Sequence, residues 1–94
     1  MVNKVKAKKV LVDMLCEIKT QDEMLFILEQ VLTKAEIEDL VNRVRIYQEL
    51  ACTQITQRDC AKILDVSISK VTRGASNLQN PKIKKYWQSK FKLR

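Results

Sequence analysis

Residues 57–76 have the types and spacing that suit one kind of chemistry, the hydrogen bonding and electrostatic recognition of DNA. They read as two short helices around a tight bend, with Asp65 in the bend and Ser67 as the cap of the second helix. The side chains that the second helix would expose on its first turns are Ile68, Ser69, Lys70 and Thr72. This pattern is typical of a helix-turn-helix, whose second helix enters the DNA major groove by its N-terminal end.

A seam of small and aliphatic residues would hold these two helices together. Ala61 is small at the point where the helices must approach each other closely. The predicted seam consists of Cys60, Ala61, Leu64, Val66 and Val71. We therefore expect a small packed head to carry the polar residues of the motif.

The positive charge of the chain is concentrated in the half that holds this motif. Residues 1–50 contain eight Lys or Arg and nine Asp or Glu, a net charge of −1, whereas residues 51–94 contain ten and two, a net charge of +8. The two halves sum to the formal net charge of +7. A basic half favours a polyanion as partner, because attraction to phosphates is strong and independent of base sequence.

The composition predicts an all-α fold. The 94 residues include one Gly and one Pro, too few for the turns that hairpins and sheets require. Because 46% of the residues are hydrophobic, more apolar surface is present than one small core can cover, and a homodimer is the expected way to bury it. Residues 1–94 are read as a single domain.

Helical spacing and capping residues predict six short helices. In order, the predicted elements are a basic flexible arm over residues 1–9 and helices over residues 10–18, 21–32, 33–52, 57–64, 67–78 and 81–94. Thr33 and Glu36 form a capping box, and Thr56 caps the next helix. Pro81 suits the first turn of the last helix, which we expect to contribute to the dimer.

Several classes of protein are disfavoured by what the sequence lacks. It has no His, no Gly-rich phosphate loop and no paired nucleophile, so neither a catalytic residue nor an enzymatic activity is expected. Its three cysteines lack CxxC spacing, so we expect no metal site and no disulfide framework, and reduced thiols indicate the cytoplasm. No apolar run approaches the ~20 residues of a membrane span, so a membrane is not an expected partner.

The motif and its neighbours resemble the bacterial Trp repressor family over about residues 24–90. The matching segments are Leu32-Thr33, Arg43-Val44-Arg45-Ile46, Glu49-Leu50, Thr56-Gln57-Arg58, Ile68, Val71-Thr72-Arg73-Gly74, Leu78 and Trp87. The four residues from Val71 to Gly74, next to a Thr-Gln-Arg helix start, make the resemblance fairly specific. The family is itself a reference case for helix-turn-helix docking and for base contacts made through water.

The resemblance implies an intertwined, all-helical homodimer with two projecting helix-turn-helix heads. It also implies L-tryptophan as a corepressor ligand bound between the core and the head, with no other cofactor. Heads on a two-fold dimer must match successive major grooves about 34–36 Å apart. A ligand that changes this spacing therefore changes DNA affinity.

The resemblance assigns a tryptophan pocket to seven residues. Arg43 and Arg73 would sandwich the indole, and Arg73 would pair with the ligand carboxylate with help from Thr33. Gly74 would let the ring approach the backbone closely. The residues assigned to the ligand ammonium group are Asn77 and, through backbone carbonyls, Gln30 and Leu32.

Two residues depart from the family pattern in this pocket. Asn77 stands in place of a Ser, and Tyr47 stands in place of a small aliphatic residue. Tyr47 either lines the cavity or partly fills it, and in the second case the protein would bind DNA without tryptophan or prefer another indole. Three of the residues assigned to the pocket also have alternative roles. Thr33 could be only a helix cap, Arg43 an exposed helix residue and Arg73 a phosphate contact.

The residues assigned to DNA are Gln57, Arg58, Lys62, Ile68, Ser69, Lys70 and Thr72. Arg58 suits a bidentate contact with a guanine edge, the alternative being a phosphate contact. Gln57 and Thr72 are expected at the DNA backbone, and Ile68 and Ser69 at the helix tip near the bases. The C-terminal lysines, which either add nonspecific affinity or form the solvated face of a dimer helix, are Lys82, Lys84, Lys85, Lys90 and Lys92.

Lys70 replaces an uncharged residue of the better-known members, and Lys62 lies next to an Ala that replaces a Lys. These changes suggest an altered operator or relocated phosphate contacts.

The sequence and the resemblance together predict a homodimeric, sequence-specific transcriptional repressor that L-tryptophan activates. Its expected partner is the double-stranded operator DNA of tryptophan biosynthesis or uptake genes, and its expected place is the cytoplasm, associated with the nucleoid when bound to DNA. One alternative is a tryptophan-independent DNA-binding regulator with an altered pocket. The other is a basic helical module that binds an acidic protein or RNA. A DNA affinity that depends steeply on salt but not on DNA sequence would favour this alternative.

Overall fold

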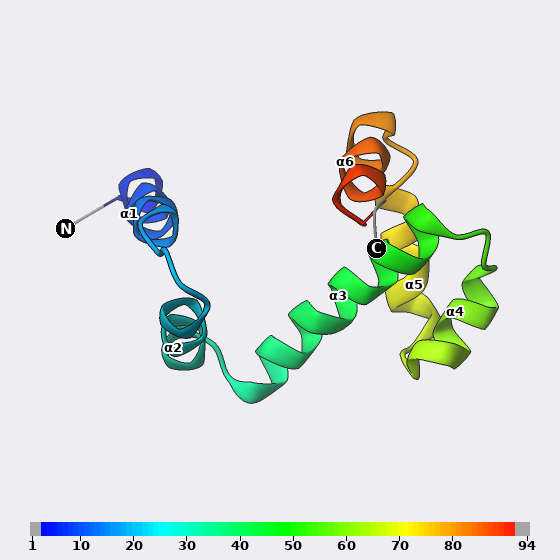
Figure 1. Cartoon of the computed structure of the whole chain (residues 1–94), viewed down its shortest axis with the longest axis horizontal. Helices are drawn as coiled ribbons and strands as arrows, with labels where there is room; N and C mark the ends of the chain where they lie inside the picture. The colour runs from blue at the N-terminus through cyan, green and yellow to red at the C-terminus, as the bar shows by residue number, and fades with distance from the viewer. Residues whose placement is uncertain (1–2, 92–94) are drawn as a thin grey trace. The chain divides into compact units, whose positions relative to one another are not determined.

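The computed structural model describes residues 3–91, and all the regular structure within them is helical, with no strand (Figure 1). The helices are α1 (Lys4–Cys16), α2 (Gln21–Val31), α3 (Lys34–Cys52), α4 (Gln57–Leu64), α5 (Ile68–Asn77) and α6 (Pro81–Phe91). The all-α prediction is confirmed. The chain divides into two compact units, Met1–Ile37 and Glu38–Arg94, with the division inside α3. None of the helices in the described part combines the length and hydropathy needed to cross a bilayer.

The N-terminal unit begins its first helix earlier than the sequence predicted. Asn3 caps α1, because its Oδ1 accepts a hydrogen bond from the Lys6 amide at 2.9 Å. The lysines of the segment expected as a flexible basic arm, residues 1–9, therefore lie on a helix from Lys4 onward. The cap was missed because the clustered lysines suggested a solvated arm, whereas one Asn side chain is enough to start a helix here.

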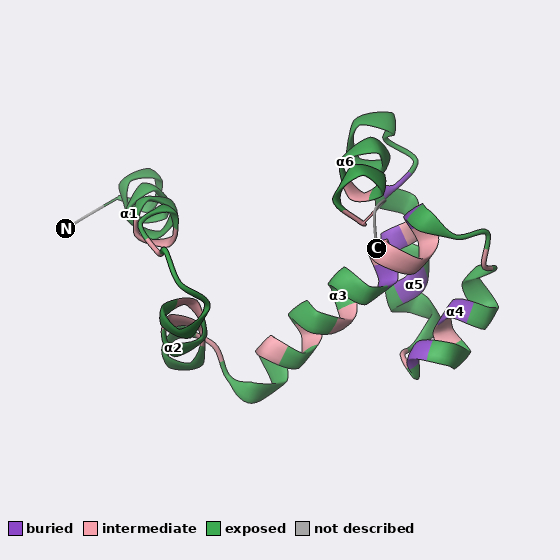
Figure 2. Cartoon of the chain, viewed as in Figure 1, coloured by how far each residue is buried: buried purple, intermediate pink, exposed green. Residues whose placement is uncertain are grey.

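None of the described residues of the N-terminal unit is buried (Figure 2). Its large exposed hydrophobic residues are Val5, Val10, Leu11, Val12, Leu25, Phe26 and Val31. Exposure of this many large apolar side chains is typical of a surface that another protein covers.

Capping residues set where the next helices begin. Thr33 Oγ1 accepts from the Glu36 amide at 3.1 Å, and the Glu36 carboxylate accepts from the Thr33 amide at 2.9 Å. Thr56 and Ser67 each accept from the amide three residues later, at 3.1 and 3.3 Å. All three predicted caps are confirmed.

The C-terminal unit is built around the helix-turn-helix of α4 and α5. Asp65 joins the two helices with φ 54° and ψ 51°, in the left-handed region that a short polar side chain tolerates. The buried core behind this turn consists of Ile46, Cys60, Leu64 and Val71, with Leu50, Ile55, Ala61 and Val66 packed against it. The predicted seam is confirmed, and α3 adds Ile46 and Leu50 to it.

Aromatic stacking joins α6 to α3 within the same unit. The Trp87 ring stacks on the Tyr47 ring, with centroids 4.8 Å apart and planes 10° apart. Gln88 Nε2 also donates to the Ala51 carbonyl at 3.1 Å. Pro81 is the first residue of α6, as predicted, whereas Lys92 and the rest of the predicted helix to residue 94 lie outside the described residues.

Candidate DNA-binding head and ligand groove

The seven residues assigned to DNA are all exposed on the helix-turn-helix. Gln57 and Arg58 are the first two residues of α4, and Lys62 lies on the same helix. The other four, on the first half of α5, are Ile68, Ser69, Lys70 and Thr72. Exposure on the N-terminal part of α5 is what insertion of this helix into a major groove requires.

Two of these residues hold each other in place. The Thr72 hydroxyl donates to Gln57 Oε1 at 3.1 Å, which ties the start of α4 to the recognition helix α5. Because this bond uses the Gln57 oxygen, the amide hydrogens of Gln57 remain as donors toward a phosphate. At the tip of α5, the Ser69 hydroxyl is hydrogen-bonded at 3.2 Å to the hydroxyl of Ser67, the residue that caps the helix.

A cavity of about 330 Å³ lies between α3 and α5. Its volume is in the lower part of the range of about 300–1,000 Å³ that is usual for small-molecule sites. The residues that line it are Asp39, Asn42, Arg43, Ile46, Tyr47, Lys70, Arg73, Gly74 and Asn77. Four of the seven residues assigned to tryptophan are thus brought together around one groove, which we call the α3–α5 groove.

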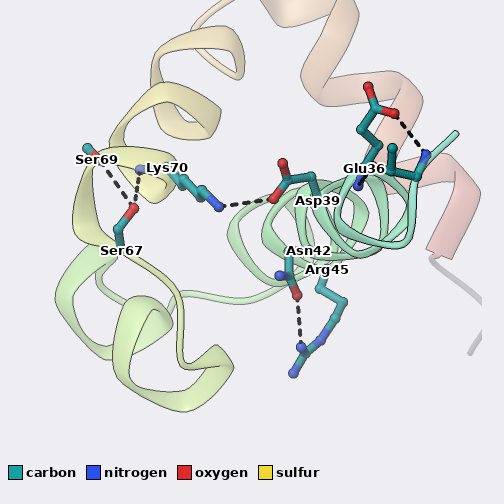
Figure 3. Close-up of polar contacts among 8 residues, drawn as sticks. Glu36, Asp39, Asn42, Arg45, Ser67, Ser69 and Lys70 are labelled. Carbon is teal, nitrogen blue, oxygen red and sulfur yellow. Dashed lines mark hydrogen bonds and ion pairs between the residues drawn. The ribbon is translucent and has the colours of Figure 1, made fainter.

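The α3–α5 groove is bounded by two polar contacts between its helices. At one end Lys70 Nζ lies 3.1 Å from Asp39 Oδ1 (Figure 3). At the other end Asn77 Nδ2 donates to the Tyr47 hydroxyl at 2.7 Å. Along α3, Tyr47 lies eight positions after Asp39, which corresponds to a rise of about 12 Å. Arg43 lies between these two ends.

Gly74 lets the two helices approach each other closely. A Cβ atom built on Gly74 would lie 2.7 Å from Ile46 Cγ2, closer than real Cβ contacts come. The sequence suggested that this glycine makes room for a ligand ring. The geometry gives a second reason, because any larger residue would push α5 away from α3 and disturb the groove.

Tyr47 lines the α3–α5 groove, which was one of the two possibilities that the sequence left open. Its ring is held against Trp87, and its hydroxyl is held by Asn77. The cavity of about 330 Å³ persists beside it. Tyr47 is therefore part of the wall of the groove and does not close it.

Sequence reasoning missed three lining residues, Asp39, Asn42 and Ile46. Their spacing from Arg43 places them on the same helix face, a signal that was available but that does not by itself distinguish a groove from a solvated face. Gln30, Leu32 and Thr33 belong to the N-terminal unit, and their assignment to the ligand stays a prediction. The Thr33 side chain serves there as a helix cap.

The charges of the α3–α5 groove favour an anionic ligand group. Arg43, Lys70 and Arg73 contribute three positive charges to the lining, and Asp39 contributes one negative charge. Planar guanidinium groups can pair with a carboxylate through two parallel hydrogen bonds, and they can also stack on aromatic rings. The groove thus suits a small acid that carries a flat ring.

Larger hollows of the C-terminal unit contain none of the residues assigned to the ligand. One of about 770 Å³ lies between the end of α3 and α6 and is lined by Cys52, Lys85 and Gln88, among others. Another of about 600 Å³ contacts Leu50 and Lys84. The smaller α3–α5 groove is the better candidate, because it combines facing helices with convergent charged groups.

The core beneath the head contains one perturbed titratable group. Burial raises the pKa of the Cys60 thiol above its ordinary value, and the negative charge of Glu49 raises it further, while Arg45 acts in the opposite direction. Cys60 therefore serves as a small hydrophobic core residue rather than as a reactive thiol.

The fold and the exposed head define a helix-turn-helix DNA-binding protein. Residues 6–88 match the sequence profile of the family described as Trp repressor protein. The chain belongs to the Trp repressor family.

Several relatives agree with this assignment. The chain is 47% identical over 85 residues to a Trp operon repressor homolog of Xylella fastidiosa strain M23, covering 90% of this chain and 92% of that protein. It is 33% identical over 69 residues to a Trp operon repressor homolog of Vibrio vulnificus strain YJ016, covering 73% and 68%. A Trp operon repressor homolog of Chlamydia caviae is 40% identical over 57 residues, covering 58% and 56%. No solved structure matches the chain. The protein is accordingly a DNA-binding repressor and a member of a regulatory family, not of an enzyme family.

Proposed function

We propose that this protein is a tryptophan-responsive repressor that binds operator DNA as a homodimer and controls genes of tryptophan synthesis or uptake. The observation that carries the proposal is the convergence of Arg43, Arg73, Gly74 and Asn77 on the α3–α5 groove. A ligand in this groove contacts α3 and the recognition helix at once, so it sets the position of α5 relative to α3. Such a contact couples ligand binding to DNA binding.

The groove offers a partner for each chemical group of L-tryptophan. We assign the indole ring to the space between the guanidinium groups of Arg43 and Arg73, and the carboxylate to Arg73. Asn77 uses its nitrogen toward Tyr47, which leaves its amide oxygen as the acceptor for the ligand ammonium group. For Gln30, Leu32 and Thr33, which belong to the N-terminal unit, a role toward the ligand rests on the resemblance alone.

For DNA, we assign base reading to Arg58, whose exposed guanidinium matches the two acceptors of a guanine edge. Ile68 and Ser69, at the tip of α5, lie where water-mediated or methyl contacts to bases are made. The residues assigned to phosphates are Gln57, Lys62, Lys70 and Thr72. Steric occlusion of a promoter then accounts for repression without any catalytic group.

The homodimer is supported by the uncovered apolar surface of the first three helices. Beyond the exposed residues of α1 and α2, the large hydrophobic residues Leu40, Val41 and Val44 of α3 are also exposed. Removing such surface from water is the main favourable contribution to protein association. We place the repressor in the cytoplasm, where operator DNA and free tryptophan are both present.

Calorimetric titration with L-tryptophan tests the groove assignment in the absence of DNA. We expect saturable binding to the wild-type protein and a loss of at least tenfold in affinity for Arg73→Ala, because that side chain is assigned to both the ring and the carboxylate. Arg58→Ala is the matched control, since Arg58 is an exposed arginine on α4 that does not line the groove and the titration contains no DNA. Equal affinities for the two variants would contradict the assignment.

A second candidate function rests on one observation, the aromatic ring of Tyr47 beside the groove. If this ring takes the place of the ligand ring, the head is already positioned and the protein represses without tryptophan. The calorimetric titration distinguishes the tryptophan-responsive repressor from the tryptophan-independent one. For the second function we expect no measurable tryptophan binding, although the protein still binds DNA.

A further inference from the structure

Lys70, one of the residues assigned to DNA, is bound by an acidic residue of its own chain. Its Nζ lies 3.1 Å from Oδ1 of Asp39 on α3 (Figure 3). Lys70 is the third residue of α5, in the part of the recognition helix that enters the major groove. In the proposed function its ammonium group contacts a DNA phosphate. Asp39 and a phosphate are therefore alternative partners for the same charge.

The ion pair can open at little cost, because both side chains keep contact with water. The Lys70 side chain is 52% exposed and the Asp39 side chain 45% exposed. Ion pairs of this kind contribute little to stability and are screened by salt. The pair is thus suited to being exchanged rather than to holding the fold together.

The same ion pair bounds one end of the α3–α5 groove, since both of its residues line the cavity. In the proposed function the ligand ring lies between Arg43 and Arg73, in the same cavity that Asp39 and Lys70 line. A ring in that position competes for space with the aliphatic stem of Lys70. Ligand binding and release of Lys70 are then linked.

We propose that Asp39 acts as an internal substitute for a DNA phosphate, which holds Lys70 away from DNA until a ligand in the α3–α5 groove releases it. The part of this inference that concerns the ligand rests on the proposed function. The competition between Asp39 and DNA for Lys70 does not depend on the identity of the ligand. It makes Asp39 a determinant of DNA affinity although Asp39 is on α3 and outside the helix-turn-helix. Removing the carboxylate would give the ligand-free protein part of the affinity that the ligand otherwise confers.

The test measures binding of a fluorescent trp-operator-like duplex by Asp39→Asn, with and without L-tryptophan, over a range of salt concentrations. Glu38→Gln is the matched control, because it removes the same charge from the neighbouring position of α3, and the structure shows no ion pair between Glu38 and Lys70. We expect ligand-free Asp39→Asn to bind about two- to fivefold tighter than Glu38→Gln. Its salt dependence should also steepen by about 0.9 in slope for each released lysine that contacts a phosphate.

A second substitution shows whether Lys70 transmits the effect. In a Lys70→Met background, Asp39→Asn should no longer tighten DNA binding. Lys70→Met alone should weaken binding in the presence of tryptophan more than in its absence, because the lysine contacts DNA only after release. The comparison of Lys70→Met with and without tryptophan tests the inference even if Asp39→Asn fails to fold.

Three results would overturn the inference. The first is equal DNA affinity and equal salt slope for Asp39→Asn and Glu38→Gln, which would mean that only the overall charge matters. The second is an effect of Asp39→Asn that persists without Lys70. The third is a loss of DNA affinity for Lys70→Met that is equal with and without tryptophan.

Failure of the proposed function gives a different pattern. If the wild-type protein ignores tryptophan while Asp39→Asn still tightens DNA binding through Lys70, the competition between Asp39 and DNA is supported and the tryptophan assignment fails.

Discussion

The Asn77 amide nitrogen donates a 2.7 Å hydrogen bond to the Tyr47 hydroxyl, and these are the two residues at which the pocket departs from the pattern of the family it resembles. The two departures are thus one structural unit, because each side chain supplies the partner of the other. The bond also fixes how the Asn77 amide is turned. The amide oxygen of Asn77 is not used in this bond, and in the proposed function it accepts from the ligand ammonium group.

Tyr47→Phe should weaken tryptophan binding about fivefold, because it keeps the ring but removes the hydroxyl that orients Asn77, and one such hydrogen bond contributes about 1 kcal/mol. Titration calorimetry checks this value. Tyr86→Phe is the control, since Tyr86 lies on α6 and contacts Trp87 edge-on without lining the groove. Unchanged tryptophan affinity of Tyr47→Phe would show that the Tyr47 hydroxyl is not needed to orient Asn77 for ligand binding.

Gly74→Ala should destabilise the head by about 1–3 kcal/mol, as expected for an added methyl in a packed interface. The new Cβ would lie 2.7 Å from Ile46 Cγ2, so α5 must move away from α3. Chemical denaturation followed by circular dichroism measures the loss. Ile46→Ala removes the clashing atom, and the cost of Gly74→Ala should therefore be smaller in that background. Strict additivity of the two substitutions would contradict the clash as the cause.

Arg58→Ala should lower affinity for operator DNA by about 1–3 kcal/mol and reduce the preference for operator over scrambled DNA. The reason is that a guanidinium group discriminates guanine through two hydrogen bonds at once. Competition binding with both duplexes measures this preference. Lys62→Ala on the same helix is the control. Because Lys62 is assigned to a phosphate, this substitution should lower the affinity for both duplexes by the same factor. The same uniform loss for Arg58→Ala would make Arg58 a phosphate contact as well.

The stability of the head should fall as the pH rises above about 8.5, the ordinary pKa of a thiol. Burial raises the pKa of Cys60 in the folded protein, so the unfolded chain loses the thiol proton first, and the free energy of unfolding decreases until the pH passes the folded-state pKa. The loss is at most about 1.4 kcal/mol for each pH unit.

Because lysines and tyrosines titrate in the same range, Cys60→Ala is the reference for this pH dependence. Thermal unfolding of both proteins between pH 7 and pH 10 should give a shallower decline for Cys60→Ala. Parallel curves would show that the thiol makes no contribution to the pH dependence.

Local features of the fold could be predicted from the sequence, whereas contacts between distant residues could not. The caps at Thr33, Thr56 and Ser67 depend on residues three positions apart, and their residue types carry the information. The Asp39–Lys70 pair joins residues 31 positions apart in the chain, on two helices that also approach each other closely at Ile46 and Gly74.

The candidate site divides in the same way. Exposure of the α5 tip followed from the helix-turn-helix pattern, and the structure confirms it. The choice between lining and filling for Tyr47 depended on Trp87, 40 positions later in α6, which holds the ring by stacking. No periodicity of α3 contains that information.

Fluorescence anisotropy can show whether tryptophan controls DNA binding by this head. A labelled trp-operator-like duplex and a scrambled duplex are titrated with the protein at physiological salt, each with and without L-tryptophan. We expect tryptophan to tighten binding to the operator duplex and to leave binding to the scrambled duplex nearly unchanged. Operator affinity that is the same with and without tryptophan would contradict this expectation.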